Sequence, residues 1–72
     1  MQRYADTDRD SGVIHFEMND SSITVWFKNT DRSYTYSYHR AGQHHVERMK
    51  QLALAGDGLN EYINDNVRKS YD

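Results

Sequence analysis

The stretch that decides the fold is ITVWFKNTDRSYTYSY, residues 23–38. In residues 23–28, isoleucine, valine and phenylalanine alternate with threonine, tryptophan and lysine, a pattern typical of a β-strand with one buried face. In residues 33–38, three tyrosines alternate in the same way with serine and threonine. Residues 29–32 lie between these two runs, and their short polar side chains favour a turn. The stretch therefore predicts a β-hairpin with one apolar face.

A further strand precedes this hairpin. Residues 13–18 alternate again, and Ile14, Phe16 and Met18 are expected to share one face of the strand. The turn residues 19–22 are too few for the crossover that a parallel pair of strands requires. We therefore expect three strands joined by two short turns, which is an antiparallel meander.

Helical periodicity follows the strands. From residue 43, apolar residues recur at spacings of three and four, as on one face of a helix. The first stripe consists of Val46, Met49, Leu52 and Ala53. Gly56 and Gly58 predict its end, because glycine readily adopts the left-handed conformation of a C-cap, and Asp57 or Asn60 is a candidate N-cap for the next helix. The second stripe consists of Leu59, Tyr62, Ile63, Val67 and Tyr71.

These elements predict an α+β fold in which a three-stranded antiparallel β-meander is followed by one long and one short α-helix packed on one face. Residues 13–72 form the single expected domain, and the polar residues 1–12 are expected to form a flexible arm. The chain has no cysteine, no apolar run near the roughly 20 residues of a membrane span, and no secretory signal pattern. We expect a cytoplasmic protein, either a monomer or a weak homodimer, that does not bind membranes.

Two motifs resemble the KTSC family, small domains named for the C-terminus of some lysyl-tRNA synthetases. The first is Phe27 followed by the turn and by Tyr34-x-Tyr36. The second is YINDNVRKSY, residues 62–71, which carries the family's closing pattern of aromatic, apolar, Asn, Val, Arg and aromatic residues. The resemblance covers residues 13–71 and implies a β-β-β-α-α domain.

The chain departs from the family at two places. His39-Arg40 stands where the family usually has Val-Pro, and residues 56–61 lack the usual serine before the closing glycine. The family has no established activity, although nucleic-acid binding has been proposed for it. The resemblance therefore implies the fold more directly than the function.

Each aromatic residue of the hairpin has two interpretations, one structural and one functional. Tyr34, Tyr36 and Tyr38 are expected in the core, because they share one strand face, although tyrosines on a sheet also stack with bases. Trp26 is expected on the opposite face, where it is either a partner-contact residue or covered by the N-terminal arm.

The closing segment is expected to complete the core. Tyr34 and Tyr36 should pack beneath the first helical stripe, with Ile63 and Val67 sealing the open edge. Arg68 is expected near the rim of the sheet, where its guanidinium meets a tyrosine ring or an acidic partner.

No motif predicts a metal site or a catalytic site. His44 and His45 are adjacent and so point in different directions on a helix, His39 lies outside that helix, and no cysteine is available as a ligand or nucleophile. The serines form no Gly-x-Ser-x-Gly elbow, and the glycines form no phosphate-binding loop. We expect a protein without metal or cofactor that is not an enzyme.

The charge distribution indicates a binding function. Net charge is −2, yet residues 21–50 carry five basic side chains against two acidic ones, while both ends of the chain are acidic. Together with the resemblance to the KTSC family and the exposed Trp26, this basic middle leads us to predict a small binding module for RNA, DNA or a protein that handles nucleic acids, whose contacts would be weak and salt-sensitive. The predicted contact residues are Trp26, Lys28, Arg32, Arg40, Arg48 and Lys50.

An alternative function belongs to a different class. Phage-encoded inhibitors of host defence, including anti-CRISPR proteins, are often compact acidic domains without catalytic residues. In this interpretation Asp6, Asp8 and Asp10 would occupy a basic groove of the target by charge complementarity. The simpler reading of these aspartates is a solvated tail.

Overall fold

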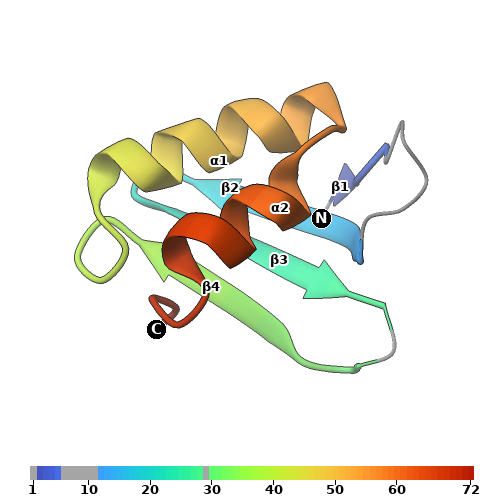
Figure 1. Cartoon of the computed structure of the whole chain (residues 1–72), viewed down its shortest axis with the longest axis horizontal. Coiled ribbons are helices and arrows are strands. Elements are labelled where there is room, and N and C mark those ends of the chain that lie inside the picture. The colour runs from blue at the N-terminus through green and yellow to red at the C-terminus, as the bar shows by residue number, and fades with distance from the viewer. Residues whose placement is uncertain (1, 6–11, 29) are drawn as a thin grey trace.

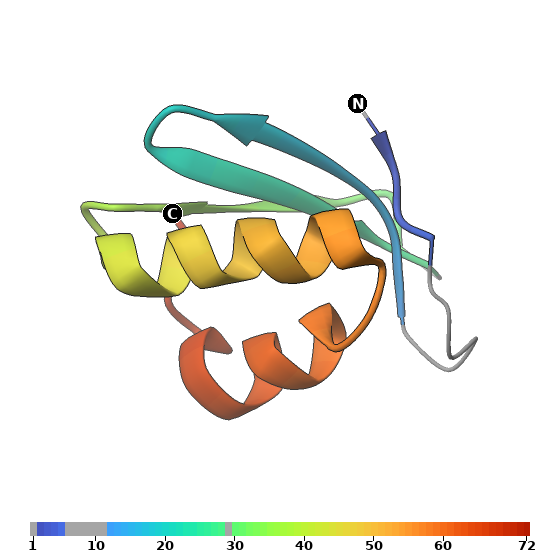
Figure 2. The ribbon, with the colours of Figure 1, turned by 90° about the horizontal axis from the view of Figure 1, so that it is seen from above.

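The computed structural model describes residues 2–5, 12–28 and 30–72. Within them the fold is α+β, with a four-stranded antiparallel sheet in the order β1-β2-β3-β4 and the helices on one side of it (Figures 1 and 2). The strands are β1 (Gln2–Arg3), β2 (Val13–Asn19), β3 (Ser22–Phe27) and β4 (Ser33–Ser37). The helical segments are α1 (Gln43–Ala55), α2 (Leu59–Tyr62) and the π-helical turn η1 (Ile63–Val67). The predicted meander and covering helices are confirmed.

The strand count was predicted wrongly, because part of the presumed N-terminal arm belongs to the sheet. Gln2 and Arg3 pair antiparallel with β2, opposite Phe16 and His15. The next residue, Tyr4, is only 3% exposed. Its hydroxyl accepts a hydrogen bond of 3.2 Å from the backbone N–H of Leu59, the first residue of α2. Residues 2–5 therefore fold with the domain, and the rest of the prediction for the arm lies outside the described residues.

The predicted inward face of β2 is also wrong at one position. The pairing of β2 with β3 is irregular between Val13 and His15. Val13 lies opposite Phe27 and His15 lies opposite Trp26, so β2 has one extra residue at this point. Such a β-bulge reverses the alternation of side chains beyond it. Val13 is consequently buried in place of Ile14, which is 39% exposed.

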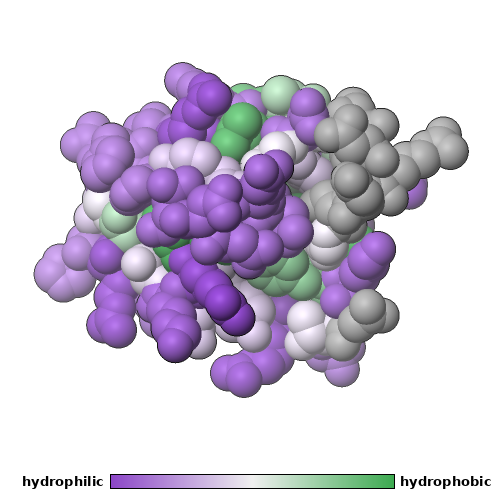
Figure 3. Space-filling model, in the orientation of Figure 1, coloured by the Kyte–Doolittle hydropathy of each residue, from purple (hydrophilic) through white to green (hydrophobic). Residues whose placement is uncertain are grey.

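The core lies between the sheet and the helices, as predicted. Tyr36 is 2% exposed and lies in one buried cluster with the helix residues above it. Tyr34 and Tyr38 are half-buried and pack against that cluster, which confirms the core reading of the tyrosines. The helix residues of the cluster are Val46, Met49, Ala53, Leu59, Ile63 and Val67. The outer surface of the helix layer is largely hydrophilic (Figure 3).

Glycines end the first helix and begin the second. Gly56 has φ 74° and caps the C-terminus of α1 in the left-handed conformation, as predicted. A Cβ built at Gly56 would lie 2.5 Å from the Cβ of Ala5, so the close approach of the N-terminal segment also requires glycine there. The N-cap of α2 is Gly58, without a side-chain hydrogen bond, so the prediction of Asp57 or Asn60 is wrong.

Candidate functional site

One face of the sheet lies away from the helices (Figure 2). On this face, strand pairing aligns one residue from each of the four strands in a row. Trp26 on β3 pairs with His15 on β2 and with Ser33 on β4, and His15 pairs in turn with Arg3 on β1. Trp26 points away from the core, because its neighbour Val25 is fully buried and successive side chains of a strand alternate. We call Arg3, His15, Trp26 and Ser33 the tryptophan row.

The rest of this open face carries hydroxyl groups, the Asn19 amide and the Glu17 carboxylate, which lies opposite Thr24. The Thr24 and Thr35 side-chain oxygens share a hydrogen bond of 2.8 Å across β3 and β4. The Asn19 side-chain amide donates to the Ser22 hydroxyl over 3.4 Å. Since these groups are small and polar, Trp26 offers the largest flat apolar surface on this face. Such a surface suits contact with the flat face of another ring.

Within the tryptophan row, His15 has an unusual environment. Its Nδ1 atom is buried and has no hydrogen-bond partner among the described residues. An unpaired buried polar atom destabilises a fold, and in natural proteins it calls for an explanation such as a functional role. Its position beside Trp26 makes the row a candidate contact surface.

The predicted cations are not gathered into one patch. Lys28 and Arg32 are exposed at the β3–β4 turn, which is the end of the sheet where the tryptophan row lies. Arg40 lies in the turn after β4, so β4 alone separates it from Arg32 by roughly 16 Å at about 3.3 Å per residue. Arg48 and Lys50 are on α1, in the other layer of the molecule. Of the six predicted contact residues, only Trp26, Lys28 and Arg32 lie near one end of the sheet.

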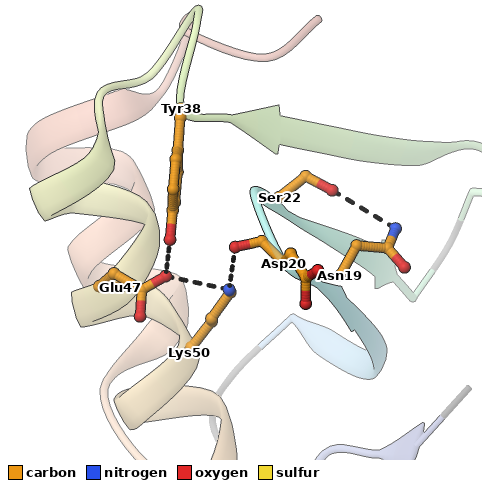
Figure 4. Close-up of polar contacts among 6 residues, drawn as sticks. All are labelled: Asn19, Asp20, Ser22, Tyr38, Glu47 and Lys50. Carbon is orange, nitrogen blue, oxygen red and sulfur yellow. Dashed lines mark hydrogen bonds and ion pairs between the residues drawn. The ribbon is translucent and has the colours of Figure 1, made fainter.

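Lys50 is engaged within the protein (Figure 4). Its Nζ lies 2.9 Å from the Glu47 carboxylate and donates over 3.2 Å to the backbone carbonyl of Asp20. The Tyr38 hydroxyl donates to the same Glu47 carboxylate. This hydrogen bond raises the pKa of Tyr38, and together with Lys50 it lowers the pKa of Glu47. The Lys50 charge is therefore compensated at neutral pH.

These three side chains line a groove with a volume of about 860 Å³. It lies between the β2–β3 turn and α1, and Asp20 and the 63% exposed Leu54 also line it. The groove contains two carboxylates and one lysine. It therefore does not provide the positive surface that the sequence predicted around Lys50.

The histidines of α1 form a local cluster. The His44 and His45 rings lie 3.9 Å apart, and His45 Nδ1 shares a hydrogen bond of 2.7 Å with the Tyr62 hydroxyl. Among the described residues, no group of three or more histidine or carboxylate side chains could hold a metal ion. This cluster ties α1 to α2.

Sequence reasoning missed Arg3 as a member of the open face. A strand of two residues is too short to show periodicity, so no pattern in the sequence could assign it to the sheet. The three aspartates of the alternative prediction, Asp6, Asp8 and Asp10, lie outside the described residues.

No family model, no curated protein and no solved structure matches this chain. The resemblance to the KTSC family therefore stays a hypothesis that rests on the two motifs. In the part of the chain that the structure describes, no helix is both long enough and apolar enough to cross a bilayer.

Proposed function

We propose that this protein is a non-enzymatic binding module that holds a single-stranded nucleic acid, RNA or DNA, on the open face of its sheet. The observation that carries the proposal is the position of Trp26, half-buried in a cross-strand row on the face away from the helices. A base stacked on an aromatic side chain contributes about 1–3 kcal/mol, whatever the sequence of the strand.

The charges near Trp26 supply phosphate contacts. Arg3 lies in the tryptophan row, while Lys28 and Arg32 lie at the adjacent end of the sheet. The described residues give none of these three cations an ion-pair partner, in contrast to Lys50. Three phosphate contacts on a single strand correspond to a salt slope of about −2, so affinity should fall roughly twentyfold between 50 and 200 mM salt.

The test is a titration of dye-labelled single-stranded RNA and of tRNA, followed by fluorescence anisotropy at the two salt concentrations. Trp26→Ala should weaken binding at least tenfold, because it removes one stacking contact of at least about 1.4 kcal/mol. Leu54→Ala is the matched control, since Leu54 is exposed on the opposite layer. This control should bind as the parent does.

Absence of binding at 50 mM salt to both RNAs and to a single-stranded DNA of the same length would remove nucleic acid as the ligand. The alternative, an inhibitor that acts by protein–protein contact, would then be favoured on the same face. Tryptophan is enriched among the residues that dominate protein interfaces, so Trp26 would be the anchor of that contact as well.

A further inference from the structure

A second surface lies at the outer edge of β4. Residues along a strand direct their backbone groups alternately to the two sides. The Tyr38 N–H, just after β4, donates towards β3, to the Ser21 carbonyl. The Tyr34 and Tyr36 backbone groups therefore face β3, while those of Ser33 and Thr35 face outward, where no further strand of the sheet pairs with them among the described residues.

The last two residues of the chain occupy part of this edge as a short strand would. The Asp72 N–H donates over 2.7 Å to the Thr35 carbonyl. The Asp72 carboxylate accepts a hydrogen bond of 2.7 Å from the Ser37 hydroxyl, which belongs to the open face. Tyr71 lies on the other face, with its ring 4.8 Å from that of Tyr34 and 6.3 Å from that of Tyr36, both edge to face. The two side chains thus alternate across the edge, as in a paired strand.

Tyr71 lies at a groove of about 290 Å³ between β4 and η1. Aromatic rings form one wall of it, and the segment after α2 forms the other. Arg68 and Lys69 on that segment are exposed, and no carboxylate among the described residues pairs with them. The residues that line the groove are Phe27, Tyr34, Tyr36, Ile63, Asn64, Arg68, Lys69 and Tyr71.

We propose that the β4 edge and this groove bind an extended peptide of a partner protein, in which an aromatic residue is followed by an acidic one. The peptide would add to the sheet as a further strand, with its aromatic ring in the groove and its carboxylate on the Ser37 hydroxyl. In the unbound protein, Tyr71 and Asp72 occupy the position of the peptide, because they present the same aromatic and acidic side chains. This proposal concerns a different surface from the tryptophan row and does not rest on the proposed function.

The side-chain contacts favour such a peptide over a second copy of the chain as the occupant. A second β4 would bring the sequence SYTYS, which offers tyrosines but no carboxylate. The Ser37 hydroxyl, which donates to the Asp72 carboxylate in the unbound protein, would then gain no acidic acceptor. An acidic residue in the added strand supplies one.

The probe is the synthetic peptide Thr-Val-Ser-Tyr-Asp-Val-Thr, and the control peptide has Ala-Asn in place of Tyr-Asp. The double variant Tyr71→Ala, Asp72→Asn removes the side-chain contacts of these two residues with β4. It should therefore bind the probe at least tenfold more tightly than the parent. Asp57→Asn, which alters an exposed carboxylate in the α1–α2 turn, is the control variant and should match the parent. The control peptide should bind the double variant at least tenfold more weakly than the probe does.

Hydrogen exchange locates the bound peptide. With the probe at saturation, the amides of Ser33 and Thr35 should exchange more slowly, while Trp26→Ala should leave the affinity for the probe unchanged. Equal affinity of the parent and the double variant, or protection elsewhere than β4, would overturn the proposal. Dimerisation of the double variant without peptide binding would also overturn it. If the double variant does not fold, the single variant Asp72→Asn replaces it. This variant should bind the probe about threefold more tightly than the parent, and equal affinity would overturn the proposal.

Discussion

The two faces of the sheet use aromatic residues in opposite ways. On the helix side, Tyr36 is 2% exposed, and burial raises its pKa to about 12. On the open side, Trp26 is half-buried opposite Ser33, and the hydroxyls of the nearby Thr24 and Thr35 hydrogen-bond to each other. Both residues lie in neighbouring strands, and their difference follows from the alternation of side chains along each strand. One face therefore stabilises the fold, while the other leaves Trp26 partly exposed.

Truncation of Tyr36 should produce the largest effect on the buried face. Tyr36→Ala removes an aromatic ring from the core, which costs about 3–5 kcal/mol. Since a domain of this size is stabilised by roughly 5 kcal/mol, the variant should be unfolded or nearly so at 25 °C. Thermal melts followed by circular dichroism measure this. Trp26→Ala should melt like the parent, and the reverse result would mean that the roles of the two faces are exchanged.

The next prediction concerns the packing of the N-terminal residues 2–5 against the helix layer. Gly56→Ala places a methyl group 2.5 Å from the Ala5 side chain and forces alanine into a left-handed conformation. The conformation alone costs about 1–2 kcal/mol, and the clash adds to it. Gly58→Ala has the same kind of conformation, with φ 80°, but its methyl meets only ordinary contact with Leu52. Urea titrations should therefore show a larger loss for Gly56→Ala, and equal losses would contradict the close packing of Ala5.

A smaller effect is expected where Tyr4 supports α2. Tyr4→Phe removes the hydroxyl that accepts a hydrogen bond from the Leu59 N–H, and it leaves that buried donor without this partner. The expected loss is about 1–2 kcal/mol in the free energy of unfolding. Chemical denaturation measures it, with Tyr71→Phe as a control at a half-exposed ring. A Tyr4→Phe variant as stable as the parent would show that residues 2–5 do not hold α2.

The smallest change in structure removes only the Tyr36 hydroxyl, whose ionisation makes the stability of the protein depend on pH. The pKa of Tyr36 is about 12 in the folded protein and about 10 in an unfolded chain. Its contribution to stability is therefore fully present below pH 10 and is lost as pH rises towards 12. Tyr36→Phe has no ionisable group at this position, so its stability should fall less over that range in thermal melts at increasing pH. The same slope in both proteins would contradict the burial of the Tyr36 hydroxyl.

The hairpin and the first helix could be predicted because their periodicities are long. Residues 23–38 alternate over two strands, and Val46, Met49 and Ala53 repeat over about two helical turns, so each pattern outweighs a single irregular residue. The bulge at Ile14 could not be predicted, because an extra residue in a strand leaves no mark in its composition. The strand at Gln2–Arg3 was missed for a related reason, since two residues carry no period.

The candidate site was predicted only in part. The orientation of Trp26 followed from the alternation in its strand, but the grouping of the cations depends on how the layers pack. Lys50 faces Glu47, and Arg48 donates to the Gln51 side chain, so neither joins the end of the sheet that carries Trp26. Sequence distance alone does not reveal such pairing.

The most direct test of the account uses the intrinsic fluorescence of Trp26, the single tryptophan of the chain. Single-stranded RNA is titrated into the unlabelled protein at 50 mM salt while the indole emission is recorded. If the open face binds nucleic acid by stacking, the emission should fall with a saturable curve, and the midpoint should move roughly twentyfold higher at 200 mM salt. An emission that stays unchanged while labelled RNA binds would place the contact elsewhere and contradict the central role of Trp26.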